Sequence, residues 1–470
     1  MKDAASRQER IAVLVFALAR TLLCGYRAAT QSITVDEATT YLNYVREHLA
    51  NVWANYDPNN HVLYSILAQL SVRALHISEF SLRLPSVLAG FFFVLGMHRV
   101  LAVAVPSAAI RWITLLGVGL APLMLDFSVA ARGYGLGLAL LTWAIYFSMR
   151  GRDFTAGVLA GLSIAATFNL AYPALGLIAC PVALGRGRIA MRFRRSLAVA
   201  AAAGGVSLAI CFPLFRQIHI AQLYAGEPEI RAALYNLVFL TIRAVPGHPG
   251  LFGTGTGTRV LQYFLLPAIL LFTIAVSIRE FRREPRLRRV LLSPLTLLVS
   301  LAGIIAGHVF LGLNYPVDRL GLYLFLLLAL SWAIAAARVA NPRILALNAA
   351  LAVILSAQFL TQFHTRFFAL WTFDSAINLV ARRLANETRD KPAGSISVSA
   401  TWFHTPALEF YRHVYRMTAL RPVERHQHTE LTGFDYYVLN LKDDDDLRGR
   451  PAPNLTSLFT DDLSGALLAK

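Results

Sequence analysis

The chain has little charge and almost no cysteine: 15% of its 470 residues are charged, and three are cysteine. Cys24, Cys180 and Cys211 lie inside or at the edge of apolar runs, where they form neither a disulfide framework nor a zinc-ligand pattern. The sequence has no His-Glu-x-x-His motif, no Cys-x-x-Cys pair and no nucleophile-elbow serine. The glycine-rich stretch 246–258 does not end in Gly-Lys-Ser/Thr, so it is not a nucleotide-phosphate loop. These absences remove the commonest signatures of soluble zinc, disulfide-rich, serine-hydrolase and nucleotide-binding proteins.

Apolar sequence is abundant instead: 56% of the residues are hydrophobic, and the mean hydropathy is +0.53. A soluble protein of this size does not carry so many long uncharged runs, so the composition predicts a polytopic helical membrane protein. The net charge of +17 could suggest nucleic acid, but the basic residues cluster in short loops, most densely at 186–195 and 279–289. This is the positive-inside pattern, for which anionic lipid headgroups are a sufficient counter-charge. We therefore expect membrane lipids as partners and no nucleic acid.

The basic loops also predict a topology. Lys2, Arg7 and Arg10 place the N-terminus inside, and the first apolar run, Ile11–Ala28, lacks a signal-peptide cleavage site, so it is expected to stay as an anchor. The later basic loops all fall inside only if the short apolar run 61–77 lies at the interface without crossing. We therefore expect about eleven spans of about 20 residues each, plus one interfacial helix. The spans are expected near residues 11–28, 84–104, 110–127, 133–149, 154–168, 170–184, 197–215, 260–278, 290–311, 320–338 and 343–360.

This topology gathers the unusual polar residues on the outer face, together with a long loop at 216–259 and the C-terminal segment. Within that segment, 395–403 and 435–441 have strand composition, and 405–416 has a helical period. The predicted fold class is an all-α polytopic membrane protein with a small soluble α/β domain at its C-terminus. The predicted domains are a transmembrane domain over residues 1–360 and an extracytoplasmic α/β domain over 361–470.

An acidic pair, Asp36-Glu37, stands just beyond the first span. Carboxylates beside a hydrocarbon boundary are costly unless they are solvated or paired, so such a pair suggests a functional site. The alternative is that Asp36 caps a surface helix through Thr39–Tyr44, with Glu37 merely solvated. Two adjacent carboxylates could also hold a divalent cation, but no third ligand is evident, so the metal requirement stays open.

Asn59, Asn60 and His61 stand at the start of the next apolar helix. A helix N-terminus offers free N–H groups and a partial positive charge, and a neighbouring histidine adds a donor, a combination that suits a phosphate. The alternative is that Asp57 or Asn59 simply caps the helix.

Two further outer helix ends carry arginine. Arg132 and Tyr134 open a span whose first turn is glycine-rich, which allows close approach of a lipid or another helix, and a guanidinium can hold a phosphate bidentately. Asn314, Tyr315 and Arg319 repeat this design at the mouth of another span. The alternatives are an arginine that snorkels to headgroups, and a structural contact between Arg319 and the aspartate before it.

Taken in order, these motifs resemble the multispan glycosyltransferases of the GT-C class. The closest group is the family that includes protein O-mannosyltransferases and the aminoarabinose transferases acting on lipid A. The resemblance covers roughly residues 10–340 and lies in the ordered motifs VDEATTYL, NNHVLYSIL, SLRLPSVLAG, FSVAARGYGL, TFNLAYPAL and DRLGLYLF. It implies transfer of a sugar from a polyprenyl-phosphate donor to an envelope acceptor (protein, lipid or glycan), usually with inversion. The expected setting is the bacterial plasma membrane, with the site on the extracytoplasmic face, and no nucleotide cofactor is expected because the sugar arrives activated on lipid.

The resemblance also implies roles for individual residues. Asp36 matches the first-loop acidic residue proposed as base for the acceptor hydroxyl, and Glu37 is its companion. His61 falls where the family commonly has a histidine or lysine near the carrier phosphate, and Arg132 and Arg319 match recurrent outer-face arginines. The sequence departs from the family at NNHVLY, where many members have two prolines. The chemistry is consistent, since an inverting displacement needs a carboxylate near the incoming hydroxyl and positive charge on the departing phosphate.

Two other classes compete with this interpretation. A lipid or sugar-lipid transporter could bind with the same outer-face residues without reaction, although we find no internal repeat and no cluster of midplane charges. A receptor or assembly scaffold would make the C-terminal domain the active part and leave the acidic pair dispensable. The sequence names neither the sugar nor the acceptor.

Overall fold

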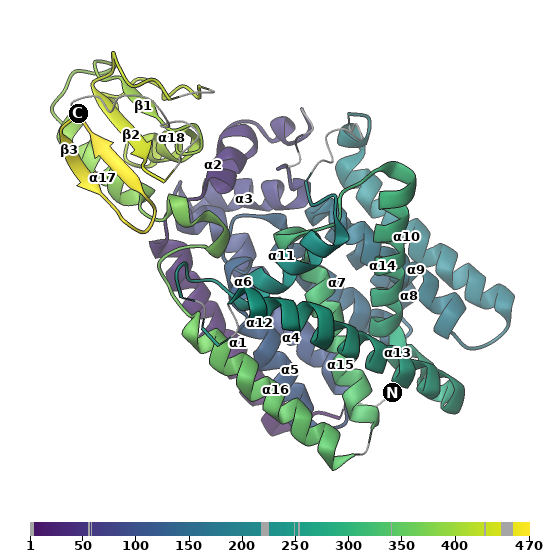
Figure 1. Ribbon diagram of the computed structural model, residues 1–470. Coiled ribbons are helices and arrows are strands. Elements are labelled where there is room, and N and C mark those ends of the chain that lie inside the picture. The colour runs from purple at the N-terminus through teal and green to yellow at the C-terminus, as the bar shows by residue number, and fades with distance from the viewer. Residues whose placement is uncertain are drawn as a thin grey trace. The chain divides into compact units, whose positions relative to one another are not determined.

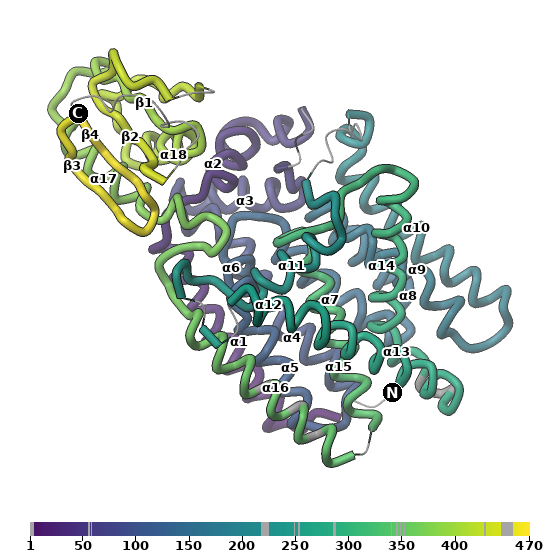
Figure 2. Tube along the Cα trace, in the orientation of Figure 1, coloured from purple at the N-terminus to yellow at the C-terminus, as the bar shows by residue number. Residues whose placement is uncertain are grey.

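The computed structural model describes residues 4–54, 57, 59–217, 225–248, 250–251, 254–339, 341–426, 429–442 and 455–470 (Figures 1 and 2). The chain divides into two compact units. The helical unit consists of Met1–Cys24, Trp53–Tyr64 and Pro85–Phe363, and the mixed unit consists of Gly25–Val52, Ser65–Leu84 and His364–Lys470. The mixed unit therefore combines the segment after the first span with the C-terminal segment of the chain.

Among the described residues, seven helices are long and apolar enough to cross a membrane, judged by length and composition. A rise of 1.5 Å per residue makes a helix of about 20 residues as long as the hydrocarbon core of a bilayer is thick. The seven contain α1 (Arg7–Thr30), α4 (Glu79–Ala104), α10 (Ile189–Phe215), α12 (Gly255–Val260) continuing through η5 (Leu261–Leu265) into α13 (Leu266–Arg283), α14 (Leu292–Leu311) after η6 (Pro285–Leu291), α15 (Leu322–Arg338) after η7 (Asp318–Gly321), and α16 (Pro342–Thr361).

Shorter helices account for most of the remaining apolar sequence. They are α3 (Val62–Leu75), α5 (Ala108–Gly119), α6 (Pro122–Asp126), α7 (Gly133–Met149), α8 (Asp153–Ala166), η3 (Phe168–Leu170), α9 (Ala171–Leu184) and α11 (Ile230–Ile242). The expectation of a continuous loop over 216–259 is wrong, because residues Ile230–Ile242 within it form helix α11. Helix α3 has 14 residues, so it is about 21 Å long and shorter than a hydrocarbon core of about 30 Å. That 61–77 does not cross, and that the spans number about eleven, both stay predictions.

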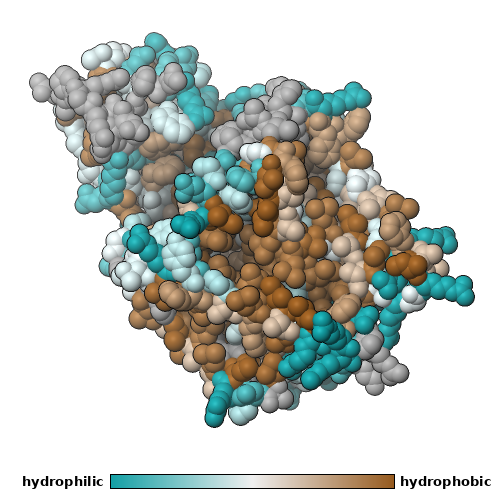
Figure 3. Space-filling model, turned by 45° about the vertical axis from the view of Figure 1, so that its right-hand side comes forward, coloured by the Kyte–Doolittle hydropathy of each residue, from teal (hydrophilic) through white to brown (hydrophobic). Residues whose placement is uncertain are grey.

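The outward faces of the long helices are apolar. Leu22, Phe264 and Phe310 are 75%, 72% and 81% exposed. Figure 3 shows hydrophobic side chains covering the visible face of the helical unit, with hydrophilic side chains gathered toward its ends. A soluble protein rarely exposes so continuous an apolar surface, whereas a lipid environment stabilises it.

Close helix packing in the helical unit depends on small residues. Helix α8 packs against both α7 and α10. A Cβ atom at Gly157 or Gly161 of α8 would lie 2.7 Å from the Val199 carbonyl oxygen or 2.6 Å from that of Ala203. This Gly-x-x-x-Gly spacing places both glycines on one face of α8, where they let the backbone of α10 approach closely.

A buried arginine in the first span ties together the ends of other helices. Arg20 of α1 donates to the carbonyl oxygen of Gly119 at 2.7 Å and to Ser128 Oγ at 2.7 Å. Gly119 is the last residue of α5, where backbone carbonyls lack partners within their own helix. The arginine therefore supplies a hydrogen-bond donor to a backbone carbonyl group where the helix is interrupted between α5 and α6.

The C-terminal part of the mixed unit is a small α/β fold. Strands β1 (Val398–Ala400) and β2 (Tyr436–Asn440) pair in parallel, with α18 (Thr405–Val414) between them in the chain, and the sheet order is β1-β2-β4-β3. The predicted strands at 395–403 and 435–441 and the predicted helix at 405–416 are confirmed. The unit also contains β3 (Ser457–Thr460), β4 (Ala466–Ala469), α17 (Ile377–Thr388), η8 (Ala369–Asp374), α2 (Val35–Thr40) and η1 (Tyr41–Val45), while η2 (Leu49–Trp53) follows in the chain. The predicted partition into residues 1–360 and 361–470 stays a prediction.

Candidate active site

The acidic pair lies in the first turn of the short helix α2. Thr34 is the N-cap residue: its Oγ1 accepts from the Glu37 N–H at 3.3 Å, and Glu37 Oε2 accepts from the Thr34 N–H at 2.9 Å. This reciprocal arrangement is a capping box, and its Thr-x-x-Glu signature is visible in the sequence. The alternative in which Asp36 is the cap residue is therefore wrong.

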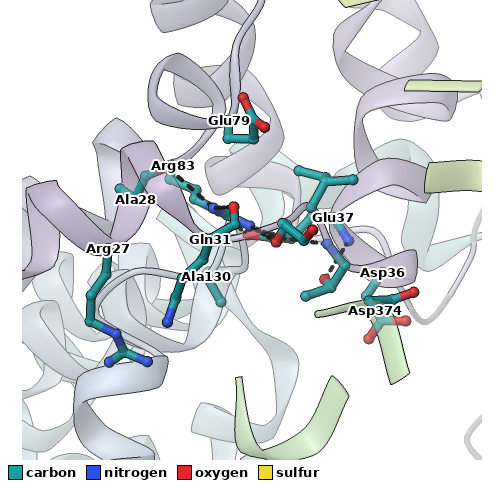
Figure 4. Close-up of polar contacts among 12 residues, drawn as sticks. Arg27, Ala28, Gln31, Asp36, Glu37, Glu79, Arg83, Ala130 and Asp374 are labelled. Carbon is teal, nitrogen blue, oxygen red and sulfur yellow. Dashed lines mark hydrogen bonds and ion pairs between the residues drawn. The ribbon is translucent and has the colours of Figure 1, made fainter. Parts of the chain in front are cut away.

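Glu37 is locked in a buried ion pair with Arg83 of α4, and both side chains are 0% exposed. Arg83 Nε donates to Oε1 at 2.8 Å and Nη2 donates to Oε2 at 2.6 Å, so the pair is bidentate (Figure 4). The same guanidinium donates to the carbonyl oxygens of Ala28, Gln31 and Ser32 at 3.2, 2.7 and 2.7 Å. Because both carboxylate oxygens are engaged, Glu37 fixes the backbone that leads into α2.

Arg83 was not among the residues that the sequence singled out. Its signal was present, since an arginine within an apolar helix marks a functional or structural site by default. The sequence does not indicate that Glu37 is its partner, because residues 37 and 83 meet only through the fold.

Asp36 has a different environment from Glu37. It is half-buried, and Asp374 at the end of η8 lies beside it (Figure 4). Asp374 Oδ2 accepts from the N–H of Val35, the first residue of α2, at 2.7 Å. Burial raises the pKa of Asp374 to about 6, and the negative charge of Asp36 adds to this rise, against the opposing effect of His404 and the Val35 N–H. The carboxylates of Asp36 and Asp374, from distant parts of the chain, therefore lie next to each other in the mixed unit.

The C-terminal segment holds the backbone before α2 at two further points. Tyr411 Oη of α18 accepts from the Ile33 N–H and donates to Glu79 Oε1, each at 2.9 Å. Ser32 Oγ accepts from the Asn378 N–H at 2.9 Å. The loop that presents the acidic pair is thus fixed largely by residues more than 330 positions away.

In the helical unit, Asp57 contacts Asn59 and Asn60 in the turn that leads into the histidine before α3. Asp57 Oδ1 accepts from the Asn59 N–H at 2.7 Å, and the Asp57 carbonyl oxygen accepts from the Asn60 N–H at 2.8 Å. The His61 Nδ1 lies 3.0 Å from the carbonyl oxygen of Ala166, the last residue of α8. His61 and Asn60 are both 5% exposed.

Arg132 and Tyr134 meet this turn from the start of α7. Arg132 is 1% exposed, and its Nη1 and Nη2 donate to the carbonyl and Oδ1 oxygens of Asn59 at 3.2 and 2.8 Å. The Tyr134 ring contacts the His61 ring edge-on, with 4.8 Å between centroids. A Cβ atom at Gly133 would lie 1.8 Å from the Ala166 carbonyl oxygen, so only glycine permits this approach.

Arg319 approaches the same histidine from η7. The backbone of η7 is joined to the turn after α8 because Asn169 Nδ2 donates to the Leu320 carbonyl oxygen at 2.8 Å. Burial lowers the pKa of His61 well below its usual value, the charges of Arg132 and Arg319 lower it further, and the hydrogen bond to the Ala166 oxygen opposes them. The imidazole is therefore neutral near pH 7, with Nδ1 as donor and Nε2 left as an acceptor.

Asn314 and Tyr315 form a separate contact in the helical unit. The N–H groups and carbonyl oxygens of Tyr315 and Glu227 pair reciprocally at 2.8 and 3.0 Å, and the Tyr315 ring stacks on His308 with 4.2 Å between centroids. Asn314 lies beside Gly226. These contacts place Asn314 and Tyr315 with residues 226–227 and His308.

The structure thus assembles two groups of predicted residues, one in each unit. Asp36 and Glu37 belong to the mixed unit, whereas His61, Arg132 and Arg319 belong to the helical unit. That His61, Arg132 and Arg319 lie around one outer-face cavity large enough for a sugar phosphate stays a prediction. In the described part of the chain no group of three or more His, Cys, Asp or Glu residues is arranged to hold a metal ion. A cation shared by Asp36 and Glu37 would also have to compete with Arg83 for both Glu37 oxygens.

No protein-family profile and no curated protein sequence matches the chain. Among solved structures, the fold is similar to that of ArnT, the lipid A aminoarabinose transferase, from Cupriavidus metallidurans bound to undecaprenyl phosphate. The TM-score is 0.55 at 12% identity, and the match covers 99% of this chain and 98% of ArnT. The apo state of ArnT gives a TM-score of 0.53 at 12% identity, with 98% of both chains covered. The chain has the GT-C fold.

The end-to-end match confirms the predicted fold class, a polytopic helical membrane protein with a small C-terminal α/β part. A looser similarity is found with the arabinosyltransferase EmbB from Mycobacterium smegmatis, at a TM-score of 0.41 and 16% identity over 71% of this chain and 30% of EmbB. At such identities the similarity establishes the fold, and function has to be argued from the site.

Proposed function

We propose that this protein is an integral membrane glycosyltransferase that moves a sugar from a polyprenyl-phosphate carrier to a hydroxyl of an envelope protein, lipid or glycan, with inversion. The observation that carries the proposal is that the two adjacent carboxylates, Asp36 and Glu37, have different environments. Glu37 is bonded through both oxygens to Arg83, whereas the adjacent Asp36 is half-buried. An inverting displacement needs one carboxylate near the incoming hydroxyl, held rigidly by its surroundings.

In this mechanism Asp36 accepts the proton of the acceptor hydroxyl as its oxygen bonds to the anomeric carbon. The bond between that carbon and the phosphate oxygen breaks, and the electron pair leaves with the polyprenyl phosphate. Glu37 is a positioning residue, because its ion pair with Arg83 and its capping box orient the first turn of α2.

The basic cluster of the helical unit has the complementary role. Negative charge develops on the departing phosphate, and Arg132 and Arg319 supply donors and positive charge to stabilise it, joined by His61 when a bound phosphate favours its protonated ring. Asn59 orients the Arg132 guanidinium through neutral oxygens, and hydrogen bonds to neutral oxygens orient an arginine without cancelling its charge. The remaining members of the proposed substrate-binding set are Asn60, Tyr134, Asn314 and Tyr315.

The similarity of the whole chain to ArnT bound to undecaprenyl phosphate supports a lipid-linked donor. A sugar that arrives activated on lipid needs no nucleotide cofactor. The proposed setting is the bacterial plasma membrane, with a cytoplasmic N-terminus and an extracytoplasmic site, as the positive-inside pattern of the arginine-rich loops predicts.

The test compares Asp36→Asn with the wild-type protein in proteoliposomes that contain radiolabelled polyprenyl-phosphate sugars, supplied one at a time with envelope fractions as acceptor. Removing a general base lowers kcat by about 10²–10⁴, while binding of undecaprenyl phosphate is retained. The matched control is Glu47→Gln, which removes an exposed carboxylate nearby in the same unit that pairs with its neighbour Arg46. Turnover by Asp36→Asn close to that of the control would exclude the proposed base. It would favour a sugar-lipid transporter that binds the same ligand without reaction.

A further inference from the structure

A cavity of about 450 Å³ lies in the C-terminal segment of the mixed unit, between helix α17 and the turn that follows α18. The two helices pack against each other (Figure 1). Arg382 and Arg389 border the cavity from the side of α17, and Arg416 borders it from the turn after α18. None of the described residues that line it is acidic. The volume falls in the range of small-molecule sites, and the mechanism described above uses none of these residues.

Arg382 is oriented by a pair of aromatic rings. Its Nε donates to Tyr415 Oη at 3.0 Å, and its guanidinium carbon lies 6.0 Å from the Tyr415 ring centroid. The Tyr415 ring stacks on that of Tyr411 in α18, with 5.4 Å between centroids. The negative charge of Glu79 acts on Arg382, but Glu79 Oε1 accepts from Tyr411 Oη at 2.9 Å. Among the described residues only Nε of Arg382 is engaged, so both Nη groups are donors for a ligand.

The other two arginines of the cavity also lack a carboxylate partner among the described residues. Arg389 Nη2 donates to Asn386 Oδ1, a neutral oxygen, at 3.2 Å. Arg416 is exposed, and no described residue bonds to its side chain. By contrast, Arg383 on the neighbouring face of α17 pairs with Glu387 at 2.8 Å. The positive charge that borders the cavity therefore belongs to groups that form no ion pair within the described structure.

Arg416 occupies a position at which the backbone favours glycine. The Met417 N–H donates to the Arg412 carbonyl oxygen at 3.0 Å, and the Arg416 N–H donates to that of His413 at 3.3 Å. These two bonds form a Schellman motif, which requires a left-handed residue just after the helix, and Arg416 has a φ of +51°. Glycine adopts this conformation without a Cβ clash, whereas an arginine is strained there. An arginine at a strained position points to a use for its side chain.

We propose that this cavity binds a phosphate monoester, carried either by a soluble sugar or by a lipid headgroup. A phosphate monoester has a charge of about −1.5 to −2 near pH 7 and three acceptor oxygens, which matches three arginines with available donors. A carboxylate has a single charge and is satisfied by one bidentate arginine.

The cavity is also larger than a phosphate group, since a water molecule occupies about 30 Å³ in the liquid. It therefore has room for part of the molecule that carries the phosphate. Asn386 and Thr418 in its wall offer an amide and a hydroxyl to that part. The inference goes beyond the proposed transferase and does not depend on it, because none of these residues takes part in the transfer step.

The experiment titrates the full-length protein in a neutral detergent with glucose 1-phosphate and, separately, with short-chain phosphatidic acid below its critical micelle concentration. Isothermal titration calorimetry measures both affinities. Tighter binding of glucose 1-phosphate identifies a soluble sugar phosphate as the source, and tighter binding of phosphatidic acid identifies a lipid headgroup. A wild-type protein that binds neither compound would overturn the inference.

Arg416→Gly gives a signature that a structural role would not give. Glycine relieves the left-handed backbone, so the thermal unfolding temperature should equal or exceed that of the wild-type protein. The affinity for the phosphate compound should nevertheless fall by about tenfold or more, because a hydrogen bond to a charged group is lost. Arg389→Gln should weaken binding similarly. Unchanged affinity in both variants, or affinity that is lost only together with stability, would overturn the inference.

The matched control is Arg383→Gln, which removes the same charge from α17 at a residue that does not line the cavity. Its affinity should equal that of the wild-type protein, and a loss as large as that of Arg416→Gly would show that binding responds only to net charge and would overturn the site. Glucuronate, a sugar with one carboxylate, should bind more weakly than the phosphate compound. Tighter binding of glucuronate would overturn the assignment of a phosphate.

Discussion

The acidic loop around Asp36 and the basic cluster around Arg132 are held in place by different means. The loop is fixed by charged and polar side chains from distant parts of the chain, chiefly Arg83, Asp374 and Tyr411. The cluster is fixed mainly by backbone carbonyl oxygens, a side-chain amide and the close approach of Gly133 to Ala166. Both groups are buried or half-buried, but removing one side chain is expected to affect stability and activity differently in the two regions.

In the loop, two of the contacts that orient the backbone, those of Arg83 and Asp374, involve ionisable side chains. Truncating Arg83 leaves a buried carboxylate without this partner, and truncating Asp374 removes the oxygen that accepts from the Val35 N–H. In the cluster, the contacts that orient His61 and Arg132 are neutral, so geometry and charge can be changed independently. Mutations in the loop are therefore expected to be severe and mutations in the cluster more selective.

The largest expected effect is that of Arg83→Met in the loop. Both members of the Arg83–Glu37 pair are 0% exposed, and removing one partner of a buried ion pair typically costs about 3–5 kcal/mol because the other charge stays buried. Thermal unfolding in detergent should show a clear loss of stability, and turnover should fall with it.

A double variant separates the buried charge from the lost packing. Glu37→Gln combined with Arg83→Met removes both charges, and replacing a buried pair by neutral groups is much less destabilising than breaking it. We expect the double variant to be more stable than Arg83→Met alone. Equal stability of the two variants would mean that the ion pair does not hold the loop.

A smaller effect is expected from Gly133→Ala, which disturbs the cluster without changing any charge. The new Cβ atom would lie 1.8 Å from the Ala166 carbonyl oxygen and 2.9 Å from His61 Cβ, so the start of α7 must shift. Overpacking of this kind costs about 1–3 kcal/mol, and affinity for undecaprenyl phosphate should fall because His61 and Arg132 move apart. Isothermal titration calorimetry or a fluorescence titration measures this loss of affinity.

Gly117→Ala is the matched control, since a Cβ atom at Gly117 of α5 meets nothing within 4 Å. This variant should bind undecaprenyl phosphate as the wild-type protein does. A Gly133→Ala protein with unchanged affinity would contradict the placement of the phosphate at the start of α7.

The same contrast explains how far the sequence could predict the molecule. Apolar runs are local properties, so most of the long helices and the strands at 395–403 and 435–441 could be predicted from composition and period. The members of the basic cluster could also be identified from the sequence, because His61, Arg132 and Arg319 each stand at one end of an apolar run. Helix α11 was missed within 216–259 because its 13 residues are too few to suggest a span.

The partners of the acidic loop could not be predicted in this way. Only the fold brings Tyr411 to Ile33, Asp374 to Val35 and His404 to Asp374. The Thr34-x-x-Glu37 capping box is the exception, since its spacing alone indicates that Glu37 turns back toward the helix start.

The smallest expected effect is a pH dependence of carrier binding through His61. In the free protein, burial and the charges of Arg132 and Arg319 lower the pKa of His61 well below its usual value, and Nδ1 is directed at the Ala166 carbonyl oxygen. Nε2 has no hydrogen-bond partner in the described structure, and on a neutral ring it is an acceptor that cannot donate to a phosphate. A bound phosphate brings negative charge, raises the pKa of His61 and favours the protonated ring, which donates from both nitrogens.

Binding therefore takes up a proton at any pH between the lowered pKa of the free protein and the higher pKa of the complex. Across that window the affinity for undecaprenyl phosphate falls as the pH rises, by at most about tenfold per unit, and it is constant below and above the window. His61→Gln should bind more weakly at low pH and lose the slope, because its amide does not titrate. The exposed His248 serves as control: His248→Gln should keep the wild-type slope. A slope that survives in His61→Gln would assign the proton to the phosphate itself or to another group, and would remove His61 from the contact.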